Sequence, residues 1–307
     1  MGLHRLTSIT IGVPNVEETI AYYTEFGLTP RGDGSFDTVD GGQQLRIAHA
    51  PQRRLLEIGV GVDDQDDVDR IARQLEGLGL GSERSEGRLV TEEPVAAFRA
   101  IVTASPRIEQ PEVPAPLYNG PGRNDRKNVR ADGVLREGQV KPRKLGHVVI
   151  GSTDREATQK FFAEGLGFRI SDEVAGLAAF MRCSTDHHNV LVQQAPLNFL
   201  HHTSWQVEDV DEIGRAATAM LENDPNRHVW GLGRHHVGSN FFWYLKDPAG
   251  NFSEYYSDID CIVDDALWKP SVWEGAHGLF NWGPPPPPSF LAPEDLAALM
   301  AGAHAAQ

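Results

Sequence analysis

The chain has few cysteines and fewer basic than acidic residues, and each shortage excludes a class of protein. Only two cysteines, Cys183 and Cys261, occur among 307 residues, which excludes a disulfide framework and predicts a reducing, cytoplasmic location. Lys and Arg number 28 against 43 Asp and Glu, and the net charge of -15 argues against nucleic acids and anionic membranes as partners. No apolar run approaches the roughly 18 residues of a membrane helix, and residues 1–30 carry no signal-peptide pattern. We therefore expect a soluble globular protein.

Two stretches of the chain resemble each other in pattern. Residues 8–28 and 147–168 both read as an alternating apolar strand, a turn and a helix, with Thr153 or Asp154 as the helix N-cap in the second copy. Segments starting at Glu57 and at His202 both read as a strand, an acidic cap and an amphipathic helix. The repeat predicts an α+β fold with two similar halves, each built from strand–helix units followed by short strands. The expected domains are residues 1–110 (non-catalytic), 111–142 (a linker), 143–260 (catalytic) and 261–307 (a Trp- and Pro-rich tail with a helix near 293–303).

Histidine is unusually frequent in the second half of the chain. Eight of the twelve histidines lie in one stretch, residues 147–236: His147, His187, His188, His201, His202, His228, His235 and His236. Histidine is the commonest metal ligand and titrates near neutral pH, so this crowding indicates a site. The alternative is that these histidines are scattered over the surface and the core.

The repeat helps to separate these alternatives. His147 aligns with Ser8 of the first copy, and His202 aligns with Glu57, so packing of the shared fold does not require histidine at either position. Residues 247–251 form a turn between two strand-like runs, which places Tyr244 opposite Glu254 on one face of a hairpin. A carboxylate that faces inward there is costly unless it is paired or binds a cation.

Two histidines and one carboxylate from three strands describe the facial triad that holds non-haem Fe(II) and leaves coordination positions open. Mn(II) fits the same donor set. On a regular strand His201 and His202 point to opposite faces, so only one of them can be a ligand, and the pattern alone does not choose. The same ambiguity holds for His187 and His188.

These motifs resemble those of a known family. The segments LGHVV, DHHN, LHHTSW and GRHHVGSNFFWYLKDPAGNFSEYY are similar to those of type I extradiol ring-cleaving dioxygenases, members of the vicinal oxygen chelate superfamily. The resemblance covers about residues 5–260 and is strongest over 145–258. It implies two tandem vicinal-oxygen-chelate domains, each a pair of βαβββ modules that form an incomplete barrel. It also implies cleavage of a catechol by O₂ at one Fe(II) per chain, in a homo-oligomer.

The resemblance also implies roles for six residues. His147, His202 and Glu254 match the metal ligands, His188 matches the acid–base histidine, and His235 and Tyr244 match the residues that hydrogen-bond the catechol oxygens. The sequence departs from some relatives at Val149, where they have Asn, and at His236, where they have a small residue. We assign no role to His228 or His236.

Aromatic residues near these motifs favour a neutral aromatic catechol. The predicted pocket residues are Phe199, Trp230, Phe241 and Trp243, with Arg234 as the one candidate to bind an anionic group. Two alternatives to the dioxygenase hypothesis are a metal-dependent isomerase or transferase of the glyoxalase or antibiotic-resistance kind, and a non-catalytic aromatic-binding module. A site confined to the second repeat argues against the first alternative. The presence of His188, His235 and Tyr244 beside a complete triad argues against the second.

Overall fold

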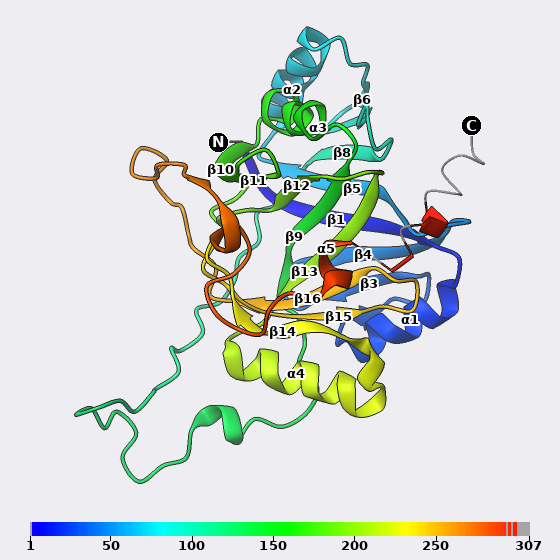
Figure 1. The fold of residues 1–307 in the computed structure, drawn as a ribbon. Helices are drawn as coiled ribbons and strands as arrows, with labels where there is room; N and C mark the ends of the chain where they lie inside the picture. Colours follow the sequence, from blue (N-terminus) through cyan, green and yellow to red (C-terminus); the bar gives the residue numbers. More distant parts are fainter. Residues whose placement is uncertain (1, 293, 296, 300–307) are drawn as a thin grey trace.

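The computed structural model describes residues 2–292, 294–295 and 297–299, and its first half forms one eight-stranded sheet. The sheet order is β2-β3-β4-β1-β5-β8-β7-β6, so two βαβββ modules lie side by side and meet at the antiparallel pair of β1 and β5 (Figure 1). The elements are β1 (Leu3–Val13), α1 (Val16–Glu25), β2 (Thr29–Pro30), β3 (Ser35–Thr38), β4 (Gly42–His49), β5 (Arg54–Val62), α2 (Gln65–Gly77), β6 (Glu83–Ser85), β7 (Arg88–Glu92) and β8 (Arg99–Ala104).

The second half repeats this arrangement and adds one strand at its edge. The sheet order is β14-β15-β16-β13-β9-β12-β11-β10-β17, and β9 and β13 form its central antiparallel pair. The elements are β9 (Lys144–Ser152), α3 (Arg155–Lys160), β10 (Arg169–Val174), β11 (Ala178–Arg182), β12 (Val190–Gln194), β13 (Phe199–Gln206), α4 (Val210–Asn223), β14 (His228–Arg234), β15 (Phe241–Lys246), β16 (Phe252–Ser257) and β17 (Val272–Trp273). The predicted α+β fold of paired modules is confirmed.

Aspartate begins the helix that follows the first strand of three of the four modules. The side chains of Asp64, Asp154 and Asp209 each accept a hydrogen bond from the backbone N–H three residues later. Such a cap satisfies a donor that has no partner within the helix. The expected cap at residue 153 or 154 is therefore Asp154.

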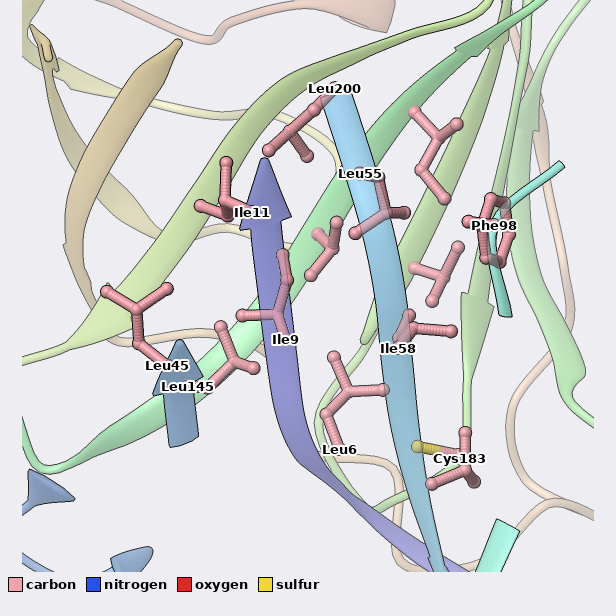
Figure 2. Packing of buried hydrophobic residues seen from close by; sticks show 14 of the residues in the cluster. Leu6, Ile9, Ile11, Leu45, Leu55, Ile58, Phe98, Leu145, Cys183 and Leu200 are labelled. Carbon is pink, nitrogen blue, oxygen red and sulfur yellow. The ribbon is translucent and has the colours of Figure 1, made fainter. Parts of the chain in front are cut away.

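The main core lies between the two sheets. Figure 2 shows Ile9 and Ile58, from β1 and β5, packing among side chains that include Leu145 and Leu200 from the second half. Burial of apolar surface stabilises a fold by roughly 25 cal/mol per Å². This shared core therefore holds the two halves together. It also fixes β9 and β13, the strands that carry two of the predicted ligands.

Two irregular segments flank the second half. Residues 105–143 contain little regular structure beyond the turn at Asp132–Val134, and they reach out from the body in Figure 1. The tail packs on the second sheet: β17 pairs with β10, and the indole N–H of Trp268 donates to the Ser171 carbonyl. A short helix, α5 (Pro288–Leu291), precedes the helix expected near 293–303, which falls largely outside the described residues. None of the described helices combines the length and the apolar character needed to cross a membrane.

Candidate metal centre

The strand register brings the three predicted ligands together. On the neighbouring strands β9, β13 and β16, Ser204 pairs with His147 on one side and with Glu254 on the other. Paired residues share a face of the sheet, and so does His202, two positions before Ser204 on the same strand. The strands β9, β13 and β16 lie side by side in the second sheet (Figure 1), so the register places the three side chains on one face of it.

The ligand atoms are close enough to hold one ion. Glu254 Oε2 lies 3.0 Å from His147 Nε2 and 3.6 Å from His202 Nε2, and one donor atom from each residue lies within 4.8 Å of the others. All three side chains are buried, and the carboxylate of Glu254 is fully inaccessible. His202 Nε2 and Glu254 Oε2 have no hydrogen-bond partner. Buried polar atoms without partners are costly, so a cation at this point fits the donors that surround it.

The second carboxylate oxygen and the histidine charge state complete the fit. Asn240 Nδ2 donates to Glu254 Oε1 at 3.2 Å, which leaves Oε2 turned toward the two imidazoles. Burial lowers the pKa of His202 well below its ordinary value, with further lowering by the neighbouring histidines. Neutral imidazole is the form that binds a metal, so the environment favours ligation.

His188 lies beside the centre on the loop between β11 and β12. Its ring centroid is 4.3 Å from that of His147, and burial lowers its pKa well below the ordinary value. The loop is held by Asn189, whose side chain accepts from the Cys183 N–H and donates to the Gly146 carbonyl. His188 is therefore a buried, neutral imidazole beside His147.

Tyr244 lies beside His202, with ring centroids 5.0 Å apart, and contacts His235. The register confirms the prediction that Tyr244 stands opposite Glu254. His235 Nδ1 donates to the Leu279 carbonyl at 2.5 Å, so in the neutral ring Nε2 accepts from the Tyr244 hydroxyl at 2.8 Å. Burial lowers the pKa of His235 and raises that of Tyr244 well above its ordinary value, so both groups are neutral near pH 7.

The expectation that His201 and His202 point to opposite faces is wrong. The register of β13 against β9 shifts between Leu200 and His202, which marks a β-bulge at His201. A bulge places consecutive side chains on similar sides of a strand. As a result the two Nδ1 atoms lie 2.8 Å apart, and both rings line the same cavity. The regular alternation of side chains along a strand gives no signal of this bulge.

Two of the three predicted ligands, His147 and His202, line a cavity of about 70 Å³. None of the five residues predicted to line it does so, which corrects that expectation. Trp230 stacks behind Tyr244, and Phe199 packs against Leu299. Phe241 and Trp243 pack on the other face of their strand, and Arg234 pairs with Asp258 at 2.6 Å. The side chains that line the cavity are His147, Val149, Phe180, His188, Leu191, Gln193, His201, His202, His235, Val237, Tyr244, Leu279 and Phe290.

Leu279 and Phe290 come from the tail, some 25 to 36 residues after Glu254. Neither residue was predicted to line the pocket. The Trp- and Pro-rich composition of the tail is a sequence feature near them, but it does not indicate which residues face the cavity.

The first half has no equivalent centre among its described residues. In the first half, Ser8, Gly59 and Ile101 occupy the register positions that His147, Ser204 and Glu254 occupy in the second half. Glu57, at the position of His202, accepts a hydrogen bond from Thr10 and forms an ion pair with Arg99. An arginine therefore neutralises the one acid of this set, and the metal-binding geometry belongs to the second half.

Comparison with known proteins is consistent with this geometry. The chain is 35% identical over 180 residues to Metapyrocatechase 2 of Cupriavidus necator, an alignment that spans 58% of this chain and 55%, about half, of that relative. It is 24% identical to the manganese-dependent 2,3-dihydroxybiphenyl 1,2-dioxygenase of Geobacillus genomosp. 3, over 90% of this chain and 92% of the relative.

Solved structures share the fold over nearly the whole chain. The 2,2',3-trihydroxybiphenyl 1,2-dioxygenase of Sphingomonas wittichii superimposes with a TM-score of 0.72 at 20% identity, covering 93% of this chain and 100% of that one. The Mn(II)-bound glyoxalase of Novosphingobium aromaticivorans gives a TM-score of 0.73 at 23% identity, with 93% of each chain covered. Residues 144–255, which carry all three ligands, match the model of one family. The matching model is that of the Glyoxalase/Bleomycin resistance protein/Dioxygenase superfamily, so this part of the chain is similar to that superfamily, and the curated relatives of the chain include extradiol dioxygenases.

Proposed function

We propose that this protein cleaves the ring of a catechol by O₂ beside its diol (extradiol or meta cleavage) and gives a semialdehyde or keto acid, as a step in the breakdown of aromatic compounds. One observation carries the proposal. His147, His202 and Glu254 direct buried donor atoms to a single point beside a cavity that His188, His235 and Tyr244 also line. The relatives named metapyrocatechase and dihydroxybiphenyl dioxygenase support it.

The proposed metal is Fe(II), with Mn(II) as the alternative for the same donors. When bound, such an ion supplies open coordination positions and the one-electron chemistry that lets O₂ react with an aromatic ring. His147, His202 and Glu254 would hold it. Relatives are named as iron-dependent and as manganese-dependent, so the printed names support both ions.

The protein's own side chains would position the catechol and move its protons. His188 is neutral, buried and next to His147, so it can take a proton from a catechol hydroxyl and return it later. The hydroxyl of Tyr244 and Nε2 of His235 can exchange their mutual 2.8 Å contact for hydrogen bonds to the catechol oxygens. Removal of water from this apolar cavity strengthens each of these bonds.

The cavity lining supports a neutral substrate. Val149, Phe180 and Leu191 offer apolar walls, and no Lys or Arg side chain lines the described cavity. An anionic substrate requires such a group, because a carboxylate buried without a partner is costly. We therefore infer that the catechol carries an apolar or no substituent.

All three ligands lie in one half of the chain, and this disfavours the isomerase or transferase alternative. Enzymes of that kind usually build their site from both halves or across a dimer, and here Glu57 of the first half is neutralised by Arg99. A non-catalytic aromatic-binding module does not need the buried atoms His202 Nε2 and Glu254 Oε2 to be left without hydrogen-bond partners.

We also propose a cytoplasmic location and a homo-oligomer. Both cysteines are free, which suits a reducing compartment. The projecting segment 105–143 exposes apolar side chains, among them Val129 at 65% and Val134 at 71%, which a second copy can cover. Light scattering on a sizing column gives the number of subunits.

Anaerobic loading with Fe(II), followed by catechol and air, tests the proposed function. We expect oxygen uptake in step with the appearance of a yellow ring-opened product. Glu254→Gln serves as the control, because it keeps the size of the side chain and removes the charged ligand. Absence of uptake in the iron-loaded wild type, over several apolar catechols, contradicts the proposal.

A further inference from the structure

His201 lies next to a proposed ligand but is not itself part of the donor set. Its two ring nitrogens have different partners: Nδ1 lies 2.8 Å from Nδ1 of His202, and Nε2 lies 2.7 Å from the carbonyl oxygen of Phe290. Both rings are buried, so no water competes for these contacts. His201 thus stands between the metal centre and the C-terminal tail.

The partners determine which nitrogens carry hydrogen. A carbonyl oxygen only accepts, so His201 Nε2 must be the donor to Phe290. A neutral His201 then has its lone pair on Nδ1. If His201 were charged, two N–H groups would face each other across 2.8 Å, so the neutral form is the one this contact allows.

The same reasoning fixes His202. Its Nδ1–H donates to His201 Nδ1, which leaves the lone pair on Nε2, the atom that points toward Glu254 at 3.6 Å. A metal-ligating histidine generally donates its other N–H to a carboxylate, a carbonyl or a water, which orients the ring and increases its basicity. Here an imidazole takes that place, and its own N–H is held by a carbonyl of the tail.

We propose that His201 is a positioning residue that fixes the tautomer and the orientation of the ligand His202, and that the Phe290 carbonyl holds His201 in turn. The β-bulge at His201 makes this possible, because it brings two consecutive side chains together on β13. The α5 helix of the tail (Figure 1) thereby becomes part of the metal centre through its backbone. The inference rests on the proposed metal ligation by His202.

Two variants separate the two contacts of His201. In His201→Asn the amide oxygen occupies about the position of Nδ1 and can still accept from His202, whereas in His201→Gln the amide nitrogen reaches about the position of Nε2 and can donate only to Phe290. We expect His201→Gln to weaken Co(II) affinity about 10–100-fold and to alter the visible absorption of bound Co(II). We expect the Co(II) affinity of His201→Asn to stay within about 3-fold of the wild-type value, because His202 keeps its hydrogen-bond acceptor.

His187→Gln is the matched control. His187 is also buried and also touches a neighbouring histidine through Nδ1, at 3.1 Å from His188, but neither residue belongs to the donor set. Its Co(II) affinity should remain that of the wild type. Wild-type affinity in His201→Gln overturns the proposal, and so does an equal loss in the Asn and Gln variants, because that result assigns the effect to packing.

The wild-type protein gives an independent readout that does not depend on the folding of any variant. Nitrogen-15 NMR of the Zn(II)-loaded protein should show hydrogen on Nε2 of His201 and on Nδ1 of His202, and the opposite tautomer at His201 overturns the proposal. Co(II) titration of Glu254→Ala distinguishes a failure of the proposed metal centre from a failure of the proposed role of His201. If Glu254→Ala also binds Co(II) normally, the proposed metal centre is wrong. If Glu254→Ala loses Co(II) binding while His201→Gln does not, only the proposed role of His201 is wrong.

Discussion

At the scale of single residues, the environment gives each polar side chain of the site a definite protonation state. Burial keeps His188, His202 and His235 neutral, and it keeps the proton on Tyr244. A neutral histidine can accept a proton and a protonated tyrosine can donate a hydrogen bond, which are the states that the proposed reaction requires.

Replacing the proposed base tests this at one position. His188→Phe should retain metal, because His188 is not in the donor set, but should lower kcat about 10²–10⁴-fold through loss of proton transfer. Metal content by atomic emission and turnover by oxygen uptake check both parts. Full activity in His188→Phe removes this role.

The hydroxyl of Tyr244 can be removed with little change in shape. Tyr244→Phe keeps the stacking on Trp230, whose ring centroid lies 5.8 Å away, and loses the hydrogen bond to His235. We expect kcat to fall about 10²–10³-fold with an unchanged metal content. A change in KM alone shows that the hydroxyl binds substrate without acting on the transition state.

The residues of the site were predictable to different extents. The turn at residues 247–251 sets a hairpin register, so the facing of Tyr244 and Glu254 followed from the sequence. The position of His201 did not follow, because a bulge adds a residue that strand alternation cannot show. The prediction that Phe241 and Trp243 line the pocket was wrong because side chains alternate along β15. These two residues lie on the opposite face from Tyr244.

At the scale of elements, the tail closes the site and one buried arginine holds it. Arg53, in the turn between β4 and β5, contacts Asp295 through two nitrogens, at 2.5 and 2.8 Å, and donates to the Leu200 carbonyl at 2.9 Å. Its side chain is 2% exposed. One residue of the first half therefore joins the tail to the strand that carries His202.

Removing this arginine should loosen the tail. Arg53→Ala leaves the buried Leu200 carbonyl without this donor, and we expect a loss of about 2 kcal/mol in the free energy of unfolding. Cleavage of the tail by added protease should also become faster. Urea unfolding and mass spectrometry of the digest measure the two effects.

Lys246→Ala is the matched control for this prediction. Lys246 pairs with Glu294, next to Asp295 in the chain, but the two side chains are 39% and 71% exposed. An exposed pair contributes little, so the change should stay within about 0.5 kcal/mol. Equal effects in the two variants contradict the special role of Arg53.

Helices and strands could be predicted from the sequence where local signals were strong. Asp154 as an N-cap and the strand–helix repeat were visible because caps and hydrophobic periodicity are local. The contact of Arg53 with Asp295 joins residues 242 positions apart, and no local pattern encodes it. The closure of the pocket by Phe290 could not be predicted for the same reason.

At the scale of the whole molecule, buried titratable groups link stability to pH. Burial lowers the pKa of His201 to about 4 and the pKa values of His188 and His202 well below 6.5. Because the unfolded chain binds these protons more readily, the stability from these groups is complete above pH 6.5 and is lost as the pH falls toward 4. Asp247 acts in the opposite direction, since burial raises its pKa to about 6 and its contribution is lost as the pH rises through that value.

These histidines, together with His235, whose pKa burial also lowers, outweigh Asp247, so the metal-free protein should become less stable from pH 7 to pH 5. Each histidine contributes a slope of about 1.4 kcal/mol per pH unit within its range. Urea midpoints in the presence of a chelator measure the trend. His201→Phe removes one titrating group, so the slope of the free energy of unfolding against pH should decrease by the amount that corresponds to about one proton. A midpoint that is constant or rises on acidification contradicts the assignment.

The two sheets share one core, and among the described residues the donor set of the proposed metal centre lies on the second sheet. The central claim is that this proposed centre directs O₂ into an aromatic ring. The most direct measurement is the mass of the product formed by Fe(II)-loaded protein from an apolar catechol under ¹⁸O₂. The account predicts one ring-opened product that carries both labelled atoms before any exchange with water. Unchanged catechol, or an oxidised product without label, contradicts it.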